Sequence, residues 1–274
     1  MTPADPHVHL ESSKPEFQAT LYEQKRYQSA VGSLMYAMLG SRPDIAYAVS
    51  NVSQFSVNPN STHWTAVKRI FRYLAGTRHR GLCYGLFGSG MGFTDADWGG
   101  GEDRKSIGGY TFLLNGAAIS WTSKKQSTVA LSSTEAEYMA LTQAVKQSIW
   151  LQGLLRDLGA QHDLAEMQNI NVDNQGAIAL ARNAEFHART KHIDIQYHFQ
   201  REHVEKKTLS LIYCPTADMT ADIFTKGLPH PSFTRHNIGL GLLEHSAFLL
   251  DTGTDDNFYE DGEWDGSTGE GWYY

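Results

Sequence analysis

The sequence predicts an α/β protein in which an α+β-like mixed sheet follows a small helical unit. Apolar residues recur every three or four positions between residues 27 and 74, which is the spacing of amphipathic helices. At Gly76 the pattern changes to short segments rich in Tyr, Phe, Thr and Ile, separated by glycine-containing turns, as in β-strands. Helical patterns then alternate with two further strand-like segments. This order favours a sheet with helices packed on it.

Three helices are expected in the helical unit, which we assign to residues 25–80. The first begins at Tyr27, and Pro43 stands where a first-turn proline would begin the second. The third is capped by Ser61 or Thr62. Its basic residues lie opposite its apolar side and fit a solvated surface or a phosphate contact equally well: Lys68, Arg69 and Arg72.

The main domain is expected at residues 81–240. Its longest helix has a capping box at Ser132 and Glu135, and Gly159 ends it. Four strands are expected before this helix, and two strands and three helical segments after it. The strands are residues 81–86, 91–98, 109–114, 118–123, 169–173 and 209–214, and the later helical segments are 176–182, 192–206 and 219–240.

Both ends of the chain differ from the body. Residues 1–24 lack periodicity and are expected to be disordered. The net charge is −7, but residues 251–274 alone contain eight acidic residues and no Lys or Arg. We expect 241–274 to be an acidic, disordered tail, and the alternative is a nucleic-acid mimic that covers a basic surface. With two cysteines, no signal peptide and no membrane-spanning run, the sequence favours an intracellular protein of the cytoplasm or nucleus, with no membrane partner.

Four acidic residues form the candidate site. Asp95 is expected on the first central strand, Glu137 in the first turn of the long helix, Asp173 at the end of the next strand, and Asp222 in the last helix. Each alone also fits an ordinary role in a turn, at a helix end or on the surface. Four converging carboxylates without a nearby Lys or Arg would repel one another and raise their pKa values. Mg²⁺ or Mn²⁺ removes this repulsion, and two such ions can support phosphodiester hydrolysis.

Six stretches of sequence carry a resemblance to a known family. They are residues 31–36, 42–49, 63–74, 120–138, 190–194 and 221–226. Together they resemble the ribonuclease H region of copia-type retrotransposon Pol polyproteins, with the end of the reverse transcriptase before it. The resemblance implies a ribonuclease H-like fold, four acids that bind two Mg²⁺ or Mn²⁺ ions, and an endonuclease that hydrolyses the RNA strand of RNA/DNA hybrids. It also implies that residues 25–80 are a remnant of the reverse transcriptase and that the rest of a retrotransposon polyprotein is a partner.

Seven residues are candidates for holding the nucleic-acid backbone, because they are cationic or carry hydrogen-bond donors. A solvated loop explains the lysines among them equally well. The candidates are Lys124, Lys125, Gln126, Ser127, Thr128, Arg189 and Lys191.

Some features depart from the family pattern. The segment before Asp222 lacks the histidine that some ribonucleases H carry there, and no Tyr-X-Asp-Asp polymerase motif occurs. Asp97 shares a strand face with Asp95 and is the weaker metal-ligand candidate. A catalytically inactive nucleic-acid-binding or structural remnant of a decayed element is therefore the alternative to an active ribonuclease H. An integrase-type recombinase is disfavoured by the order of the acids.

Overall fold

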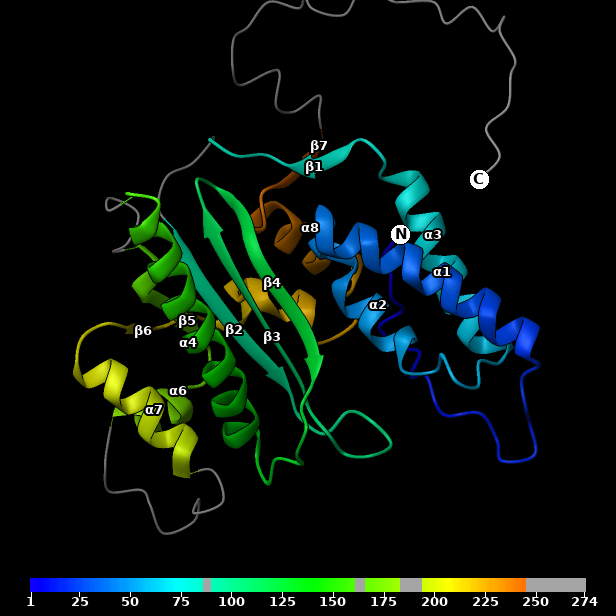
Figure 1. Ribbon diagram of the computed structural model, residues 1–274, viewed down its shortest axis with the longest axis horizontal. Coiled ribbons are helices and arrows are strands. Elements are labelled where there is room, and N and C mark those ends of the chain that lie inside the picture. The colour runs from blue at the N-terminus through cyan, green and yellow to red at the C-terminus, as the bar shows by residue number, and fades with distance from the viewer. Residues whose placement is uncertain (86–89, 161–165, 183–193, 245–274) are drawn as a thin grey trace, which may run out of the picture.

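The computed structural model describes residues 1–85, 90–160, 166–182 and 194–244. Its centre is a five-stranded sheet in the order β4-β3-β2-β5-β6 (Figure 1). Neighbours among β4, β3 and β2 are antiparallel, whereas β5 runs parallel to β2 and β6 parallel to β5. The prediction of an α/β protein with a mixed sheet is confirmed. The strands are β2 Met91–Asp97, β3 Ile107–Leu114, β4 Ala117–Lys125, β5 Asn169–Val172 and β6 Ser210–Tyr213.

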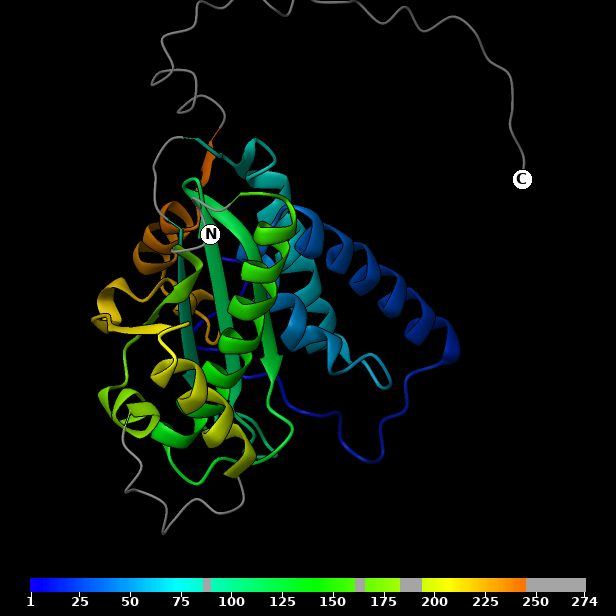
Figure 2. The ribbon, with the colours of Figure 1, turned by 60° about the vertical axis from the view of Figure 1, so that its left-hand side comes forward.

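Helices cover both faces of this sheet (Figures 1 and 2). Successive strand residues point to opposite faces, so that Phe112 packs with α4, α6 and α7, whereas Leu113 packs with the helical unit, η6 and α8. Among the described residues, no helix is both long enough and apolar enough to cross a membrane. The helices are α1 Leu21–Gly40, η1 Pro43–Ile45, α2 Ala46–Ser53, α3 Ser61–Gly76, α4 Ser133–Asp157, η2 Glu166–Gln168, α6 Gln175–Arg182, α7 Asp194–Glu205, η5 Thr216–Asp218, η6 Thr220–Phe224 and α8 His230–Gly239.

The caps of the helical unit differ from the predicted ones. α1 begins before Tyr27, at a capping box formed by Thr20 and Glu23. The apolar pattern could not locate this start, because Tyr27 is the first buried residue of the helix. The cap of α3 is Asn60, whose side chain accepts hydrogen bonds from the backbone amides of the second and third helical residues. A longer side chain one residue earlier therefore takes the role predicted for Ser61 or Thr62.

Residues 1–20 form no helix or strand, but they pack against the helical unit. Arg69 of α3 donates to the backbone oxygen of Thr2 at 2.9 Å and to the carboxylate of Asp5 at 2.7 Å. The imidazole Nε2 of His63 lies 2.8 Å from the backbone oxygen of Glu11. The expectation of a disordered start did not foresee these contacts, since the side chains that make them come from much later in the chain. Arg69 is accordingly engaged within the chain rather than free for a phosphate.

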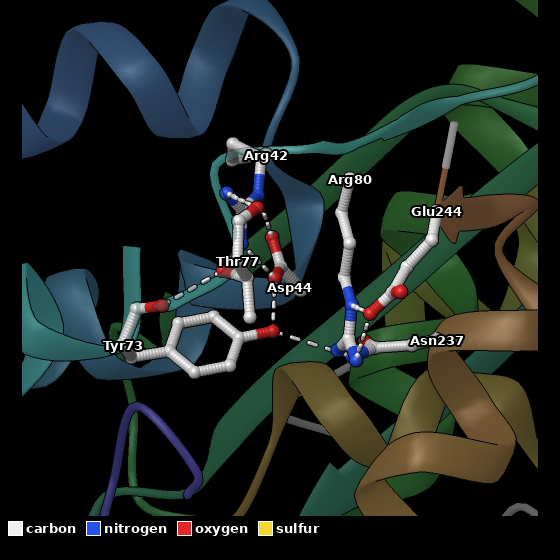
Figure 3. A network of polar contacts seen from close by, with 7 residues as sticks. All are labelled: Arg42, Asp44, Tyr73, Thr77, Arg80, Asn237 and Glu244. Carbon is white, nitrogen blue, oxygen red and sulfur yellow. Dashed lines mark hydrogen bonds and ion pairs between the residues drawn. The ribbon is translucent and has the colours of Figure 1, made fainter. Parts of the chain in front are cut away.

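A buried polar network, here called the polar joint, links the helical unit to α8 (Figure 3). Arg42 donates to both carboxylate oxygens of Asp44, at 2.9 and 2.7 Å, and the hydroxyl of Tyr73 donates to the same carboxylate. Asn237 of α8 donates to the Tyr73 oxygen at 3.3 Å. Burial, together with the negative charge of Asp44, raises the pKa of Tyr73. The polar joint consists of Arg42, Asp44, Tyr73 and Asn237, and its charges are balanced internally.

A separate two-stranded ribbon connects the two ends of the main domain. β1 (Arg80–Leu82) pairs antiparallel with β7 (Leu242–Glu244), and Arg80 forms an ion pair with Glu244 at 3.0 Å (Figure 3). Of the strand predicted at 81–86, residues 81–82 belong to β1, residues 83–85 are not in a strand, and residue 86 lies outside the described residues. The partner of β1 lies in the stretch assigned to the tail. The rest of that tail, residues 245–274, lies outside the described residues.

The last helical region is interrupted. Residues 219–240 were predicted as one region, but η6 and α8 are separate, and Pro229 precedes the first residue of α8. A proline lacks the amide that a helix interior requires, so a helix can begin there but cannot continue through it. Asp222 consequently lies in a short 3-10 turn and not in the final helix.

Candidate functional site

Three of the four predicted acids converge, and we call them the acid cluster: Asp95, Glu137 and Asp173. Each offers a carboxylate oxygen, and these oxygens lie within 4.8 Å of one another. β2 and β5 are parallel with Thr94 opposite Val172, so the residues that follow, Asp95 and Asp173, are neighbours. Glu137 comes from the fifth position of α4. The cluster therefore lies near the carboxyl ends of β2 and β5, where the beginning of α4 meets them.

The start of α4 is fixed by its cap, which in turn positions Glu137. Ser132 accepts a hydrogen bond from the backbone amide of Glu135 at 3.2 Å, which is one half of the predicted capping box. The Glu135 carboxylate accepts from the backbone amide of Leu131 at 3.0 Å. The first turn of the helix is therefore tied to the chain that precedes it.

Asp222 approaches the acid cluster from η6, which lies on the other face of the sheet from α4. Gly109 pairs with Asp95 in the β2–β3 ladder, and a Cβ atom at Gly109 would lie 2.6 Å from the Cβ of Phe224. Because Gly109 has no side chain, η6 can lie directly against the sheet. The hydroxyl of Thr225 donates to Asp95 and links the two elements. Asp222 does not belong to the group of three, but it lies close enough to Asp95 for the charge of Asp95 to raise the pKa of Asp222.

Lys226 is a residue of the site that the sequence interpretation missed. Its ammonium nitrogen lies 3.0 Å from Oδ1 of Asp222 and 3.8 Å from Oδ2 of Asp95. Burial disfavours its charge, but the two carboxylates raise the pKa of Lys226 on balance. The condition under which the repulsion was considered, four carboxylates without a nearby Lys or Arg, is therefore not met. The spacing of four residues between Asp222 and Lys226 was a signal that could have revealed the pair.

The negative charges of the site still outnumber this one cation. Burial, followed by the charges of Asp95 and Asp173, raises the pKa of Glu137 to about 10. Burial and Asp95 raise the pKa of Asp222 to about 7, although Lys226 acts in the opposite direction. Burial and Asp95 also raise the pKa of Asp173, which accepts a hydrogen bond from Thr216 at 2.9 Å. These carboxylates are held together despite their mutual repulsion.

The donor set fits a hard divalent cation. Oε2 of Glu137 is buried and has no hydrogen-bond partner among the residues that the structure describes. Such an oxygen is costly to bury unless something neutralises it. An arrangement made of carboxylate oxygens alone is the kind that Mg²⁺ and Mn²⁺ bind. The cluster could therefore hold a metal ion through Asp95, Glu137 and Asp173.

Asp97 lies farther along β2 and does not belong to the group of three. The pKa of Asp97 is raised on balance. Burial is the largest cause, Lys226 acts in the opposite direction, and the charge of Asp95 adds to the rise. The sequence-based preference for Asp95 over Asp97 agrees with this arrangement.

The predicted backbone-contact residues at the end of β4 differ in their surroundings. Lys124 is exposed, whereas Lys125 forms an ion pair with Asp103 at 2.9 Å and donates to the Gln54 side chain at 2.9 Å. The side-chain amide of Gln126 donates to the backbone oxygen of an α4 residue at 2.8 Å. Gln126 therefore holds β4 against α4, and Lys125 is already paired.

The remaining candidates are a pair of exposed residues and two residues that the structure does not describe. Ser127 and Thr128 are exposed in the loop before α4. A space of about 330 Å³ between β3 and α4 is lined by Lys124, Lys125, Gln126 and Ser127 together with residues of both elements. Arg189 and Lys191 lie outside the described residues. Nucleic-acid binding by this set stays a prediction.

Comparison with known proteins identifies relatives of most of the chain. No family model matches it. The retrovirus-related Pol polyprotein from transposon TNT 1-94 of Nicotiana tabacum is 47% identical over 234 residues, which cover 82% of this chain and 17% of that polyprotein. The Pol polyprotein from transposon RE2 of Arabidopsis thaliana is 40% identical over 227 residues, covering 82% of this chain and 15% of the relative. Secreted RxLR effector protein 161 of Plasmopara viticola is 53% identical over 128 residues, covering 46% of this chain and 90% of that protein.

The matches to the two polyproteins extend over 82% of the chain, yet the chain spans only 15–17% of their length. It corresponds to one segment of a much longer protein. The residues that build the acid cluster belong to the same chain whose sequence carries this similarity. The chain belongs to the family of copia-type retrotransposon Pol polyproteins, as a segment of such a polyprotein.

Proposed function

We propose that this segment is a metal-dependent endonuclease with a ribonuclease H-like fold, which hydrolyses the RNA strand of RNA/DNA hybrids. The observation that carries the proposal is the convergence of Asp95, Glu137 and Asp173 from three separate elements, with Asp222 beside them. Buried acids with strongly raised pKa values and an unpaired oxygen are costly for the fold, and such groups gather at functional sites. In this proposal residues 25–80 are a remnant of the reverse transcriptase and 81–240 form the nuclease domain.

Asp95, Glu137, Asp173 and Asp222 are the proposed ligands of two Mg²⁺ or Mn²⁺ ions. When bound, these ions supply an activated water and stabilise the charge on the leaving oxygen of a phosphodiester. The chain itself orients the ligands, because Thr225 donates to Asp95 and Thr216 donates to Asp173. Lys226 adds a positive charge beside Asp222 and Asp95, which limits their repulsion.

Recognition of RNA requires contacts to the 2′-hydroxyl groups, and positioning requires contacts to the phosphates. Lys124, Ser127 and Thr128 are exposed near the end of β4 and are the proposed contacts. Lys125 must first leave Asp103 before it can bind a phosphate. Arg189 and Lys191 are proposed on the sequence alone.

The test is cleavage of an RNA/DNA hybrid labelled on the RNA strand, with Mg²⁺ and then with EDTA. We expect RNA cleavage with Mg²⁺, no cleavage with EDTA, and a loss of at least about 100-fold in the Asp95→Asn variant. Asp157→Asn is the matched control, because Asp157 is an exposed acid at the far end of α4. Hybrid binding without any cleavage by the wild-type protein would contradict the proposal and support the inactive-remnant alternative.

A further inference from the structure

An exposed aromatic side chain lies at the end of the strand that carries Asp95. Trp98 directly follows β2, three residues after Asp95, and 52% of its surface is exposed. A tryptophan left half exposed retains a large apolar face that can pack against a partner. The proposed metal ligands make no use of this side chain.

The indole of Trp98 is held in place. Its Nε1–H donates to the backbone oxygen of Ala130 at 3.0 Å. Ala130 is buried and packs with Ala136 and Met139 of α4. The ring is therefore tied to the loop that leads into the helix carrying Glu137. An aromatic surface that is already fixed loses little conformational entropy when a ligand packs on it.

The surroundings of Trp98 combine apolar and polar side chains. Val129 and Leu131, which flank Ala130 in the same loop, are 45% and 72% exposed. Ser127 and Thr128 precede them and are also exposed. The register of β3 and β4 places Lys124 opposite Gly108, and β3 pairs Gly108 with Ala96 of β2. The end of the sheet at which β2 and β4 finish thus carries an aromatic face, hydroxyl groups and a cation, and Asp95 lies on β2.

This combination favours a nucleic-acid strand over other occupants. A duplex is held through its phosphates and sugars, and hydroxyl groups, a cation and an apolar face can make such contacts. A protein partner could cover the apolar residues, but Trp98 follows the strand that carries Asp95, and its hydrogen bond joins it to the loop before the helix that carries Glu137. The backbone of Gly99–Gly101, next to Trp98, adds little side-chain bulk.

We propose that Trp98, with Val129 and Leu131, contacts a nucleotide next to the reacting phosphate, packing on its sugar at the surface of the duplex. The inference rests on the proposed function and assigns a binding role that is separate from metal ligation. Trp98 positions the nucleic-acid strand, and the hydroxyl groups of Ser127 and Thr128 bind the phosphate backbone of that strand.

Binding is measured apart from cleavage, with a labelled RNA/DNA hybrid and Ca²⁺ in place of Mg²⁺. We expect Trp98→Ala to weaken binding about tenfold and Trp98→Phe only about two- to threefold, because a smaller ring keeps part of the apolar contact. Trp150→Ala is the matched control. Trp150 is 58% exposed, but it lies about 20 Å farther along α4 than Glu137. Binding by Trp150→Ala should equal that of the wild type.

A second measurement does not depend on how well the alanine variant folds. Hybrid binding should quench part of the tryptophan fluorescence in the wild type, and this part should be missing in Trp98→Phe. Equal quenching in both proteins, unchanged affinity in Trp98→Ala, or no hybrid binding by the wild type would each overturn the inference.

The two proposals can fail separately. Wild-type protein that binds hybrid with Trp98 quenching but does not cut RNA would remove the proposed hydrolysis and keep the binding surface. Protein that cuts RNA equally well with and without the Trp98 side chain would remove the binding surface and keep the nuclease.

Discussion

The polar joint and the acid cluster are both built on buried carboxylates, but they balance charge in opposite ways. Asp44 in the polar joint is 1% exposed and is bound by both an arginine and a tyrosine hydroxyl. The carboxylates of the acid cluster face one another, with Lys226 at one side. The first arrangement satisfies its own charges and fastens helices together. The second keeps a negative charge that an external cation can neutralise, which is what a metal site requires.

Breaking the polar joint should have the largest effect on stability. Arg42→Ala leaves the carboxylate of Asp44 buried without its cation, so we expect the free energy of unfolding to fall by about 3–5 kcal/mol. Urea unfolding followed by circular dichroism measures this change. Arg78→Ala removes an exposed arginine just after α3 and should change stability by less than about 0.5 kcal/mol. A loss below about 1 kcal/mol in Arg42→Ala would mean that the joint is not structural.

The acid cluster should respond to pH in a way that the polar joint does not. The pKa of Glu137 is raised in the folded state from an ordinary 4.5 to about 10, so the folded protein holds a proton that the unfolded chain releases. Stability from this group is complete below about pH 4.5 and is lost as the pH rises toward 10. Without metal, the loss by pH 7 reaches up to about 3 kcal/mol.

Thermal unfolding between pH 5 and 9, in EDTA, measures this dependence. We expect the Tm of the wild type to fall as the pH rises and that of Glu137→Gln to fall much less. Mg²⁺ should restore the wild-type Tm at high pH but not change the variant to the same extent, because metal binding replaces the proton. Parallel curves for the two proteins in EDTA would contradict the assignment of the effect to Glu137.

A smaller effect is expected where η6 meets the sheet. Gly109→Ala places a methyl group 2.6 Å from the Cβ of Phe224, so η6 must shift and Asp222 with it. We expect a loss of about 1–3 kcal/mol in stability and weaker Mg²⁺ binding, measured by calorimetry. Gly153→Ala, in open space on α4, is the control and should stabilise the protein by up to about 1 kcal/mol. Mg²⁺ affinity equal in both variants would show that Asp222 does not depend on this contact.

Local patterns in the sequence predicted many of the elements that carry the acid cluster. The cap at Ser132 and the order of strands and helices follow from short-range hydrogen bonding and from the period of apolar residues, and these placed Asp95, Glu137 and Asp173 on converging elements. Such signals lie within a few residues of each other, so they can be read without knowing the fold.

Contacts between distant segments could not be predicted in this way. The ion pair of Arg69 with Asp5, which holds the first residues in place, joins positions 64 residues apart. The pairing of β1 with β7 has no local signal, because each strand is only three residues long. The position of Asp222 was missed for another reason, since a proline divides a region whose apolar spacing alone suggested one helical stretch.

The ribbon of β1 and β7 brings the two ends of the expected main domain together, while one face of its sheet shares a core with the helical unit. The chain enters the domain at Arg80 and leaves it at Glu244, and these two residues are paired. A domain whose ends are adjacent can be inserted into a longer chain without stretching either connection, and its own order of strands does not depend on what is fused to it. In a segment that matches 15–17% of the length of its polyprotein relatives, the paired ends and the core shared with the helical unit hold both parts in one body.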